Sequence, residues 1–226
     1  MKKEILAFFF LCFYASTFTE GYGEVLQRLP TQQKVVALTF DACEARVPSF
    51  FDMQIINFLL QERIPATLFV TGKFAKRNQR EMKALATFPF LEFENHSVSH
   101  PAHMERLSEK EMIRELDDSF LRELTGKKTR FFRFPGGNCD ARAVQIVESH
   151  QYRIVHWSFA SGDADRRITP SMLSTWVLEK TRPGSILIFH VNGRGYSTAA
   201  ALPGMVRKIS QRGYRFVTLA NYFEEP

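Results

Sequence analysis

Two histidines stand four residues apart in the segment His96-Ser97-Val98-Ser99-His100. Imidazole is a common zinc ligand, and two imidazoles at this spacing face one point if the segment makes a helical turn. The pair therefore predicts a metal site, although histidines at this spacing are often only surface or capping residues. The zinc-peptidase motif requires Glu directly after the first histidine, and Ser97 occupies that place, so this class of protease is disfavoured.

Three further side chains have the chemistry for acid–base catalysis or charge stabilisation. Asp41 closes an apolar segment with a carboxylate, and burying a carboxylate is costly unless it is paired, hydrated or bound to a metal. It is either a general base or a helix-cap or loop carboxylate. His190 ends an apolar run, as a catalytic group or as a satisfied core histidine. Arg133 comes shortly before a Pro-Gly-Gly turn. In one interpretation Arg133 orients a carboxylate while backbone N–H groups of the turn stabilise an oxyanion. In the other, Arg133 forms a structural ion pair.

These polar residues lie where predicted strands end. Short apolar runs alternate with stretches of helical periodicity, which is typical of βα units around a parallel sheet. In a parallel barrel the strand ends that carry Asp41, His96, Arg133, Asp163 and His190 face one mouth, where barrel enzymes place their active sites. Seven strands are predicted, at residues 35–40, 66–70, 91–93, 131–134, 153–157, 185–189 and 215–219.

The length of 226 residues favours one domain, predicted over residues 24–226, and a closed or nearly closed (β/α) barrel. A doubly wound open sheet is the alternative, but no Gly-rich phosphate loop follows the first predicted strand, which disfavours a dinucleotide-binding fold. Helices are indicated by apolar spacing within residues 55–60, by a capping box from Ser108 to Glu111, and by N-caps at Asp140 and Thr169.

The composition is that of a globular protein. It is 45% hydrophobic and 24% charged, with 12 Gly and 10 Pro, which excludes low-complexity disorder, collagen and a polytopic membrane protein. The formal net charge of +6 is spread along the chain without a basic run. Nucleic acid is therefore not expected as a partner.

The first 23 residues have the layout of a secretory signal. Two lysines precede an apolar run over residues 5–14, and cleavage is expected between Thr17 and Gly23. A bilayer span needs about 20 apolar residues, so we expect a periplasmic or secreted protein without a stable membrane span. An uncleaved N-terminal anchor is the alternative. Export would leave Cys43 and Cys139 in an oxidising compartment, either paired in a disulfide or as separate thiols.

Taken in order, the chemistry-bearing residues resemble the motifs of polysaccharide deacetylases of the NodB homology group, the fourth carbohydrate esterase family. The resemblance covers about residues 34–219, and five motifs in order are far more specific than any one of them. The family's Thr-Phe-Asp-Asp motif corresponds to Thr39-Phe40-Asp41-Ala42, and its His-(Ser/Thr)-x-x-His motif is complete in His96, Ser97 and His100. The other three motifs correspond to Arg133, Pro135, Gly136 and Gly137, to Trp157 and Asp163, and to Ile188 and His190.

This resemblance implies a distorted (β/α) barrel of about seven parallel strands that removes N-acetyl groups from sugars in peptidoglycan or a chitin-like polysaccharide. His96 and His100 would bind a divalent metal, usually zinc, which lowers the pKa of a bound water and polarises the amide carbonyl. Asp41 would take the proton of the water, and His190 would protonate the departing amine.

The remaining motif residues would position these groups and the substrate. By the same resemblance, Arg133 would hold Asp41 and Asp163 would orient His190. The backbone N–H of Gly136 would stabilise the oxyanion together with the metal. Pro135 and Trp157 would border the substrate at the same cleft.

Three positions depart from the family pattern. Ala42 stands where the family has its second Asp, the third protein ligand of the metal, and an alanine methyl cannot bind a metal. Asp41, Glu44, Cys43 or extra water would have to replace that ligand. Gly136 replaces an aromatic residue and Ala164 replaces a Trp, so the walls of the sugar-binding cleft are expected to differ.

Two other functions compete with a polysaccharide deacetylase. The first is a glycan-binding relative without catalysis, which Ala42 favours and which the retained acid, base and histidines argue against. The second is a hydrolase of small amides or cyclic imides on the same fold. An open groove that accepts several sugar rings would favour a polymer, whereas a closed pocket would favour a small amide.

Overall fold

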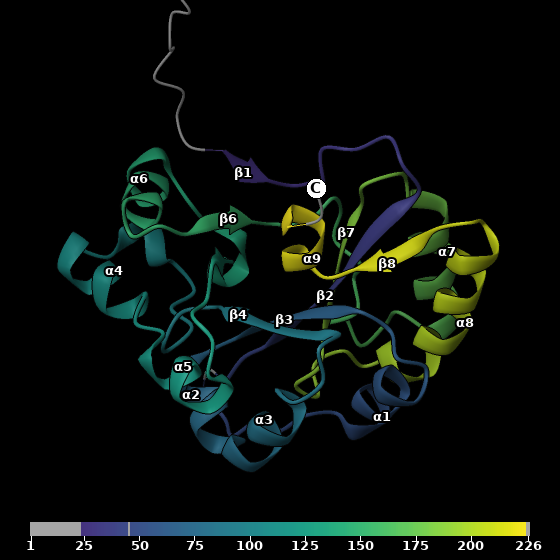
Figure 1. The fold of residues 1–226 in the computed structure, drawn as a ribbon, viewed down its shortest axis with the longest axis horizontal. Helices are drawn as coiled ribbons and strands as arrows, with labels where there is room; N and C mark the ends of the chain where they lie inside the picture. Colours follow the sequence, from purple (N-terminus) through teal and green to yellow (C-terminus); the bar gives the residue numbers. More distant parts are fainter. Residues whose placement is uncertain (1–23, 45, 225–226) are drawn as a thin grey trace, which may run out of the picture.

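The computed structural model describes residues 24–44 and 46–224. A parallel β-sheet forms its centre and helices surround it (Figure 1). The strands are β1 (Val25–Leu26), β2 (Val35–Ala42), β3 (Ala66–Val70), β4 (Leu91–Asn95), β5 (Phe131–Phe132), β6 (Arg153–Val155), β7 (Ile186–His190) and β8 (Arg215–Val217). Their order is β1-β6-β5-β4-β3-β2-β7, and β8 pairs with β2.

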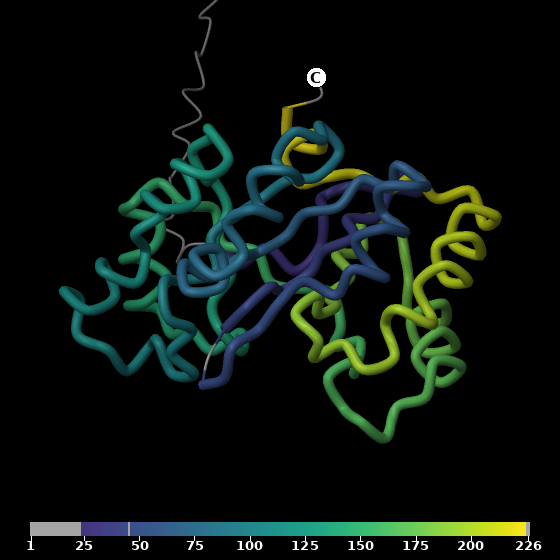
Figure 2. Tube along the Cα trace, turned by 90° about the horizontal axis from the view of Figure 1, so that it is seen from below, coloured from purple at the N-terminus to yellow at the C-terminus, as the bar shows by residue number. Residues whose placement is uncertain are grey.

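Two isolated bridges connect the ends of this sheet. Arg28, just after β1, pairs with Ser185 just before β7, and Phe159, beyond β6, pairs with Leu187 within β7. The sheet therefore curls back on itself, and the predicted distorted barrel of parallel strands is confirmed. The loops that follow β2, β6 and β7 all lie toward the lower edge of the view in Figure 2, so they are on the same side of the barrel.

Nine α-helices lie within the described residues. Their first turns are held by side-chain caps at Asp52, at Asp140 and at Thr169, and Ser108 forms a capping box with Glu111. The helices are α1 (Met53–Gln61), α2 (Gly72–Arg77), α3 (Gln79–Leu85), α4 (Glu109–Glu115), α5 (Ser119–Thr125), α6 (Ala141–Ser149), α7 (Pro170–Lys180), α8 (Thr198–Gln211) and α9 (Leu219–Glu224). Short 3-10 helices span Met104–Arg106 and Pro135–Gly137.

The two faces of β2 have different neighbours because side chains alternate along a strand. Phe40 and Ala42 belong to the large apolar cluster that packs the sheet against α1, α2, α7 and α8. Ala37 belongs to a second cluster with Phe69 of β3, and the same face of β2 continues to Thr39 and Asp41. Asp41 and Ala42 therefore start from opposite faces of the strand.

The predicted strands are confirmed, with shifts at their ends. β2 and β4 are longer than expected, whereas β5 and β6 end earlier, so Phe134 and Trp157 lie beyond them. β1 was not predicted, because two residues are too few to show a pattern. The expected leader lies outside the described residues. In the part of the chain that is described, no helix combines the length and hydropathy that a bilayer crossing requires.

Candidate functional site

Asp41 and Arg133 form a buried ion pair at the end of β2. Nη1 of Arg133 donates to Oδ1 of Asp41 over 2.8 Å, and Nη2 donates to the hydroxyl of Thr39 and to the carbonyl of His156, both over 2.9 Å. The guanidinium carbon also lies 4.0 Å from the centre of the Phe69 ring. Burial favours a neutral Asp41, but electrostatic interactions with His96, Arg133 and His190, together with the hydrogen bond from Arg133, outweigh burial and hold the pKa of Asp41 below its ordinary value. Asp41 is therefore ionised, and it is not a helix cap.

His96 approaches both of these residues. Its Nδ1 is 2.8 Å from the carbonyl oxygen of Arg133, which can only accept, so Nδ1 carries the proton. Burial lowers the pKa of His96, which leaves Nε2 with a lone pair in the neutral ring. That Nε2 is 3.5 Å from Oδ2 of Asp41. The unprotonated nitrogen of His96 thus faces the carboxylate of Asp41 in a buried space.

His100 completes the histidine pair through an irregular turn. The helical turn expected for this segment is absent: Ser97 and His100 have positive φ values of 72° and 59°, and the hydroxyl of Ser97 accepts the N–H of His100 over 2.9 Å. The rings of His96 and His100 are 5.1 Å apart and nearly perpendicular, at 73°. Burial and the neighbouring His96 lower the pKa of His100 to about 4, so both imidazoles are neutral at physiological pH.

The two imidazoles fit a divalent cation, because each is neutral and a backbone carbonyl orients His96 in the way common for metal-binding histidines. A third protein ligand is missing. Within the described residues, no group of three or more His, Cys, Asp or Glu side chains is arranged to hold a metal ion. Ala42 is fully buried in the apolar cluster and offers no donor.

Neither proposed substitute from the following loop joins the histidine pair. Glu44 is engaged by the guanidinium of Arg77, whose Nη2 donates to Oε1 over 2.9 Å, and by the backbone N–H of Ser49. Burial and the charge of Asp41 raise the pKa of the Cys43 thiol to about 11, so the metal-binding thiolate is disfavoured. Cys43 and Cys139 are both free thiols, so the disulfide alternative is not realised.

His190 and Asp163 form the second charged pair of the site. His190 ends β7, and its Nδ1 is 2.9 Å from Oδ1 of Asp163, while its backbone N–H donates to Oδ2 over 2.7 Å. The hydroxyl of Thr198 also donates to Oδ2 over 2.9 Å. Burial lowers the pKa of His190, but the hydrogen bond and charge of Asp163 outweigh it and raise the pKa above its ordinary value. His190 is thus a paired, partly exposed imidazole and not a core histidine.

Two residues that support this pair, Thr198 and Gly195, were not identified from the sequence. A Cβ atom on Gly195 would lie 2.8 Å from Oδ2 of Asp163 and closer still to the carbonyl of His190. Glycine therefore lets this loop pass directly beside the carboxylate. The Gly that follows a strand-end histidine at a distance of a few residues was the available clue.

The Pro135-Gly136-Gly137 turn and Trp157 border the site from another side. Gly136 and Gly137 adopt positive φ values of 66° and 73°. A Cβ atom on Gly137 would lie 2.6 Å from the Trp157 ring, so glycine is required for the indole to pack on this turn. Gly136 and Trp157 both line the same cavity as Asp41.

This cavity, called here the central hollow, has a volume of about 390 Å³. Two larger cavities share lining residues with it, one through Ala160, Ser161 and Gly162 and the other through His100 and Arg194. The three therefore adjoin one another at the mouth of the barrel, and together they are called here the track. The central hollow is lined by Asp41, His100, Gly136, Trp157, Ala160, Ser161, Gly162, Asp163, Ala164, Asp165, Ile188, His190 and Arg194.

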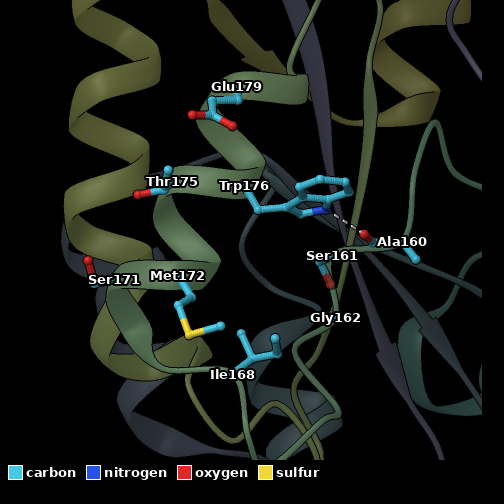
Figure 3. A pocket seen from close by; sticks show the side chains of 9 residues that line it. All are labelled: Ala160, Ser161, Gly162, Ile168, Ser171, Met172, Thr175, Trp176 and Glu179. Atoms are coloured by element: carbon cyan, nitrogen blue, oxygen red, sulfur yellow. Dashed lines mark hydrogen bonds between the residues drawn. The ribbon is translucent and has the colours of Figure 1, made fainter.

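The neighbour that shares Ala160, Ser161 and Gly162 is the α7 groove, of about 580 Å³. Figure 3 shows Trp176 and Met172 projecting from α7 beside it, with Ile168 below them. The indole N–H of Trp176 donates to the carbonyl of Ala160 over 2.9 Å, which fixes the ring although it is 43% exposed. The groove is lined by Ala160, Ser161, Gly162, Ile168, Ser171, Met172, Thr175, Trp176 and Glu179.

Comparison with solved structures confirms the fold. The Bc1960 peptidoglycan N-acetylglucosamine deacetylase superposes with a TM-score of 0.80 at 26% identity, covering 89% of this chain and 94% of that one. Wild-type BA3943, described as a CE4 family pseudoenzyme from Bacillus anthracis, has a TM-score of 0.79 at 26% identity, covering 89% and 69%. Active and inactive proteins thus share this architecture.

The sequence comparisons agree with the structure. A peptidoglycan-N-acetylglucosamine deacetylase of Bacillus cereus (strain ATCC 14579) is 28% identical over 204 residues, which are 89% of this chain and 93% of that protein. The family model for polysaccharide deacetylase matches residues 28–155, more than half of the chain. The chain therefore belongs to the polysaccharide deacetylase family, carbohydrate esterase family 4.

Proposed function

We propose that this protein is an exported, metal-dependent N-deacetylase of an acetylated polysaccharide such as peptidoglycan. The observation that carries the proposal is the retention of two charged pairs at one cavity, Asp41 with Arg133 and His190 with Asp163. A protein that only binds a glycan needs neither an ionised base nor an acid of raised pKa at the same hollow. The peptidoglycan deacetylases among its relatives support the class of substrate.

In this mechanism His96 and His100 would hold a divalent cation, with zinc as the expected ion. When bound, the cation would supply Lewis acidity, which lowers the pKa of water and polarises the acetamide carbonyl. Asp41 accepts the proton of the attacking water on the carboxylate oxygen that Arg133 does not engage. Arg133 keeps the carboxylate of Asp41 ionised and in place before the proton is transferred.

The second half of the reaction is the departure of the amine. The C–N bond of the tetrahedral intermediate breaks as His190 donates a proton to the sugar nitrogen, so acetate and a free amine leave. Asp163 holds the His190 ring through Nδ1, which leaves Nε2 for proton transfer. The backbone N–H of Gly136 donates to the oxyanion, with Trp157 at the border of the sugar ring. Pro135, expected at the same border, is buried and does not line the central hollow.

Ala42 lowers the affinity for the cation but does not remove its two imidazole ligands. Since Glu44 is held by Arg77 and the Cys43 thiol has a raised pKa, water would complete the coordination of the cation, which leaves Oδ2 of Asp41 free to act as the base. We expect a weaker metal site than one with three protein ligands.

The shape of the site favours a polymer over a small amide or cyclic imide. The central hollow shares lining residues with the α7 groove and, through other residues, with the cavity beyond His100. An acetylated sugar placed at the central hollow therefore has neighbouring space for further sugar rings. The exposed indole of Trp176 offers a stacking surface for one of them.

A glycan-binding protein without catalysis is the second candidate, because Ala42 cannot act as a ligand and a family pseudoenzyme shares the fold. Acetate release from peptidoglycan and from chitooligosaccharides, in the presence of Zn²⁺ or Co²⁺, separates the two. The deacetylase account expects release by the wild-type protein and none by Asp41→Asn. Glycan binding without release, together with release by a folded Ala42→Asp variant, would support the binding protein.

A further inference from the structure

The cavity beyond His100, called here the arginine pocket, is distinct in its charge. It has a volume of about 750 Å³, the largest of the three cavities along the track. Three arginines from three different loops line it, Arg46 after β2, Arg166 after β6 and Arg194 after β7. Its lining residues include no Asp or Glu.

None of these three arginines forms an ion pair with a carboxylate of the described residues. Arginines close to them do: Arg77 pairs with Glu44, and Arg167 pairs with Asp165. Arg166 instead places its guanidinium 4.2 Å from the centre of the Tyr196 ring. The carboxylates of Glu44 and Asp165 are thus bound by arginines outside the pocket, and that of Glu115 accepts hydrogen bonds from the backbone N–H and the hydroxyl of Ser99.

The arginine pocket is part of the substrate track. His100 and Arg194 line both this pocket and the central hollow, so a group in the pocket lies within a short distance of the sugar at the reacting centre. Guanidinium groups bind carboxylates through paired N–H donors, and stacking on an aromatic ring holds such a group in place. Three cations that share one cavity also repel each other, and an anion relieves that repulsion.

We propose that the arginine pocket binds a carboxylate of the glycan, so that the preferred substrate is an acidic N-acetylated polysaccharide. This inference rests on the proposed deacetylase function and makes its substrate specific. Peptidoglycan offers such a carboxylate from two sources. In strands without peptide, it is the lactyl carboxylate of N-acetylmuramic acid. In strands that carry stem peptides, it is a carboxylate of the peptide. A chitin-like polymer offers none.

The test compares a double variant, Arg46→Gln with Arg166→Gln, against Arg167→Gln, whose arginine is exposed, paired with Asp165 and outside the pocket. Acetate release is measured on peptide-free peptidoglycan strands, on strands that carry stem peptides, and on chitooligosaccharides. We expect the double variant to lose about tenfold or more in kcat/KM on a carboxylate-bearing strand, since charge-assisted hydrogen bonds are lost, with chitooligosaccharides unchanged. Arg167→Gln should behave as wild type on all three.

The strand that shows the loss identifies the source: peptide-free strands point to the lactyl carboxylate and peptide-bearing strands to the peptide. An equal loss on chitooligosaccharides, or no loss on either strand, overturns the proposal. If no substrate releases acetate, the deacetylase function has failed, and calorimetric binding of the same three glycans then decides on the pocket alone. In the absence of acetate release, the pocket proposal is overturned if acidic and neutral glycans bind equally, or if the double variant binds them as the wild type does.

Discussion

Arg133 contacts both halves of the reaction centre: its side chain donates to Asp41 over 2.8 Å, while its backbone carbonyl lies 2.8 Å from Nδ1 of His96. Its guanidinium is fully buried and also bonds to Thr39 and to two backbone carbonyls. One residue therefore fixes the ionisation of the base and the tautomer of the metal-binding imidazole. The position of Arg133 at the end of β5 follows from the barrel, because neighbouring parallel strands end at the same side.

Removing this guanidinium should cost stability as well as activity. Arg133→Met leaves the carboxylate of Asp41 buried without its partner, and breaking a buried ion pair in this way costs about 3–5 kcal/mol. The free energy of unfolding, measured by denaturant titration, checks the effect. Arg167→Gln breaks an exposed pair and should leave the free energy of unfolding nearly unchanged. Equal stability of the two variants would mean that the buried pair is not formed.

The sequence predicted those parts of the fold that depend on local pattern. β2, β3 and β7 are buried on both faces and therefore read as continuous apolar runs, and the capped helix starts depend on single side chains. The charged residues at strand ends could be assigned to one mouth because parallel topology places them there. The pairing of Asp41 with Arg133 and of His190 with Asp163 was implied by the family resemblance, and the structure forms both pairs.

Features that depend on tertiary contacts could not be predicted in the same way. The spacing of His96 and His100 suggested a helical turn, but the chain reaches the same convergence through left-handed backbone at Ser97 and His100. The closing bridges, such as Arg28 with Ser185, join residues far apart in sequence. The arginine pocket likewise requires three loops to be placed before its charge becomes visible.

The raised pKa of His190 predicts the alkaline side of the pH profile. A general acid must be protonated, so its contribution is present below its pKa and is lost as the pH rises through that value. Asp163 raises this pKa, and burial opposes it. Asp163→Asn should therefore move the alkaline limb of kcat to lower pH by about one unit or more. Thr198→Val removes one hydrogen bond to the same carboxylate but keeps its charge, and should move the limb less. An unmoved limb in Asp163→Asn would exclude His190 as the acid.

Trp176 should matter for long substrates and not for short ones. Stacking of one sugar ring that buries roughly 40 Å² of apolar surface is worth about 1 kcal/mol, or about a fivefold change in affinity. Trp176→Ala should raise KM for longer oligomers by that factor while kcat is unchanged, because the ring is remote from the reacting bond. Steady-state kinetics across a series of oligomer lengths measures this change in KM.

Met172→Ala, on the same helix face, serves as a control for loss of apolar surface without an aromatic ring. A rise in KM that does not depend on oligomer length would rule out a stacking subsite at α7.

The metal site should depend on the histidines and not on Glu44. His100 is only partly buried, so His100→Ala should remove metal binding with a small loss of stability. Glu44→Gln should leave metal affinity unchanged because the Glu44 carboxylate is held by Arg77. Calorimetric titration with Zn²⁺ after chelation checks both variants. Weaker zinc binding by Glu44→Gln would show that Glu44 replaces the ligand lost at Ala42.

The central claim is that the retained acid and base make this chain an enzyme in spite of Ala42. It is tested most directly by acetate release from N-acetylated peptidoglycan with the zinc-reconstituted wild-type protein, beside its Asp41→Asn variant. The account predicts release by the wild type that depends on added metal and is lost in Asp41→Asn. A folded, zinc-loaded wild type that binds the glycan and releases no acetate would contradict it.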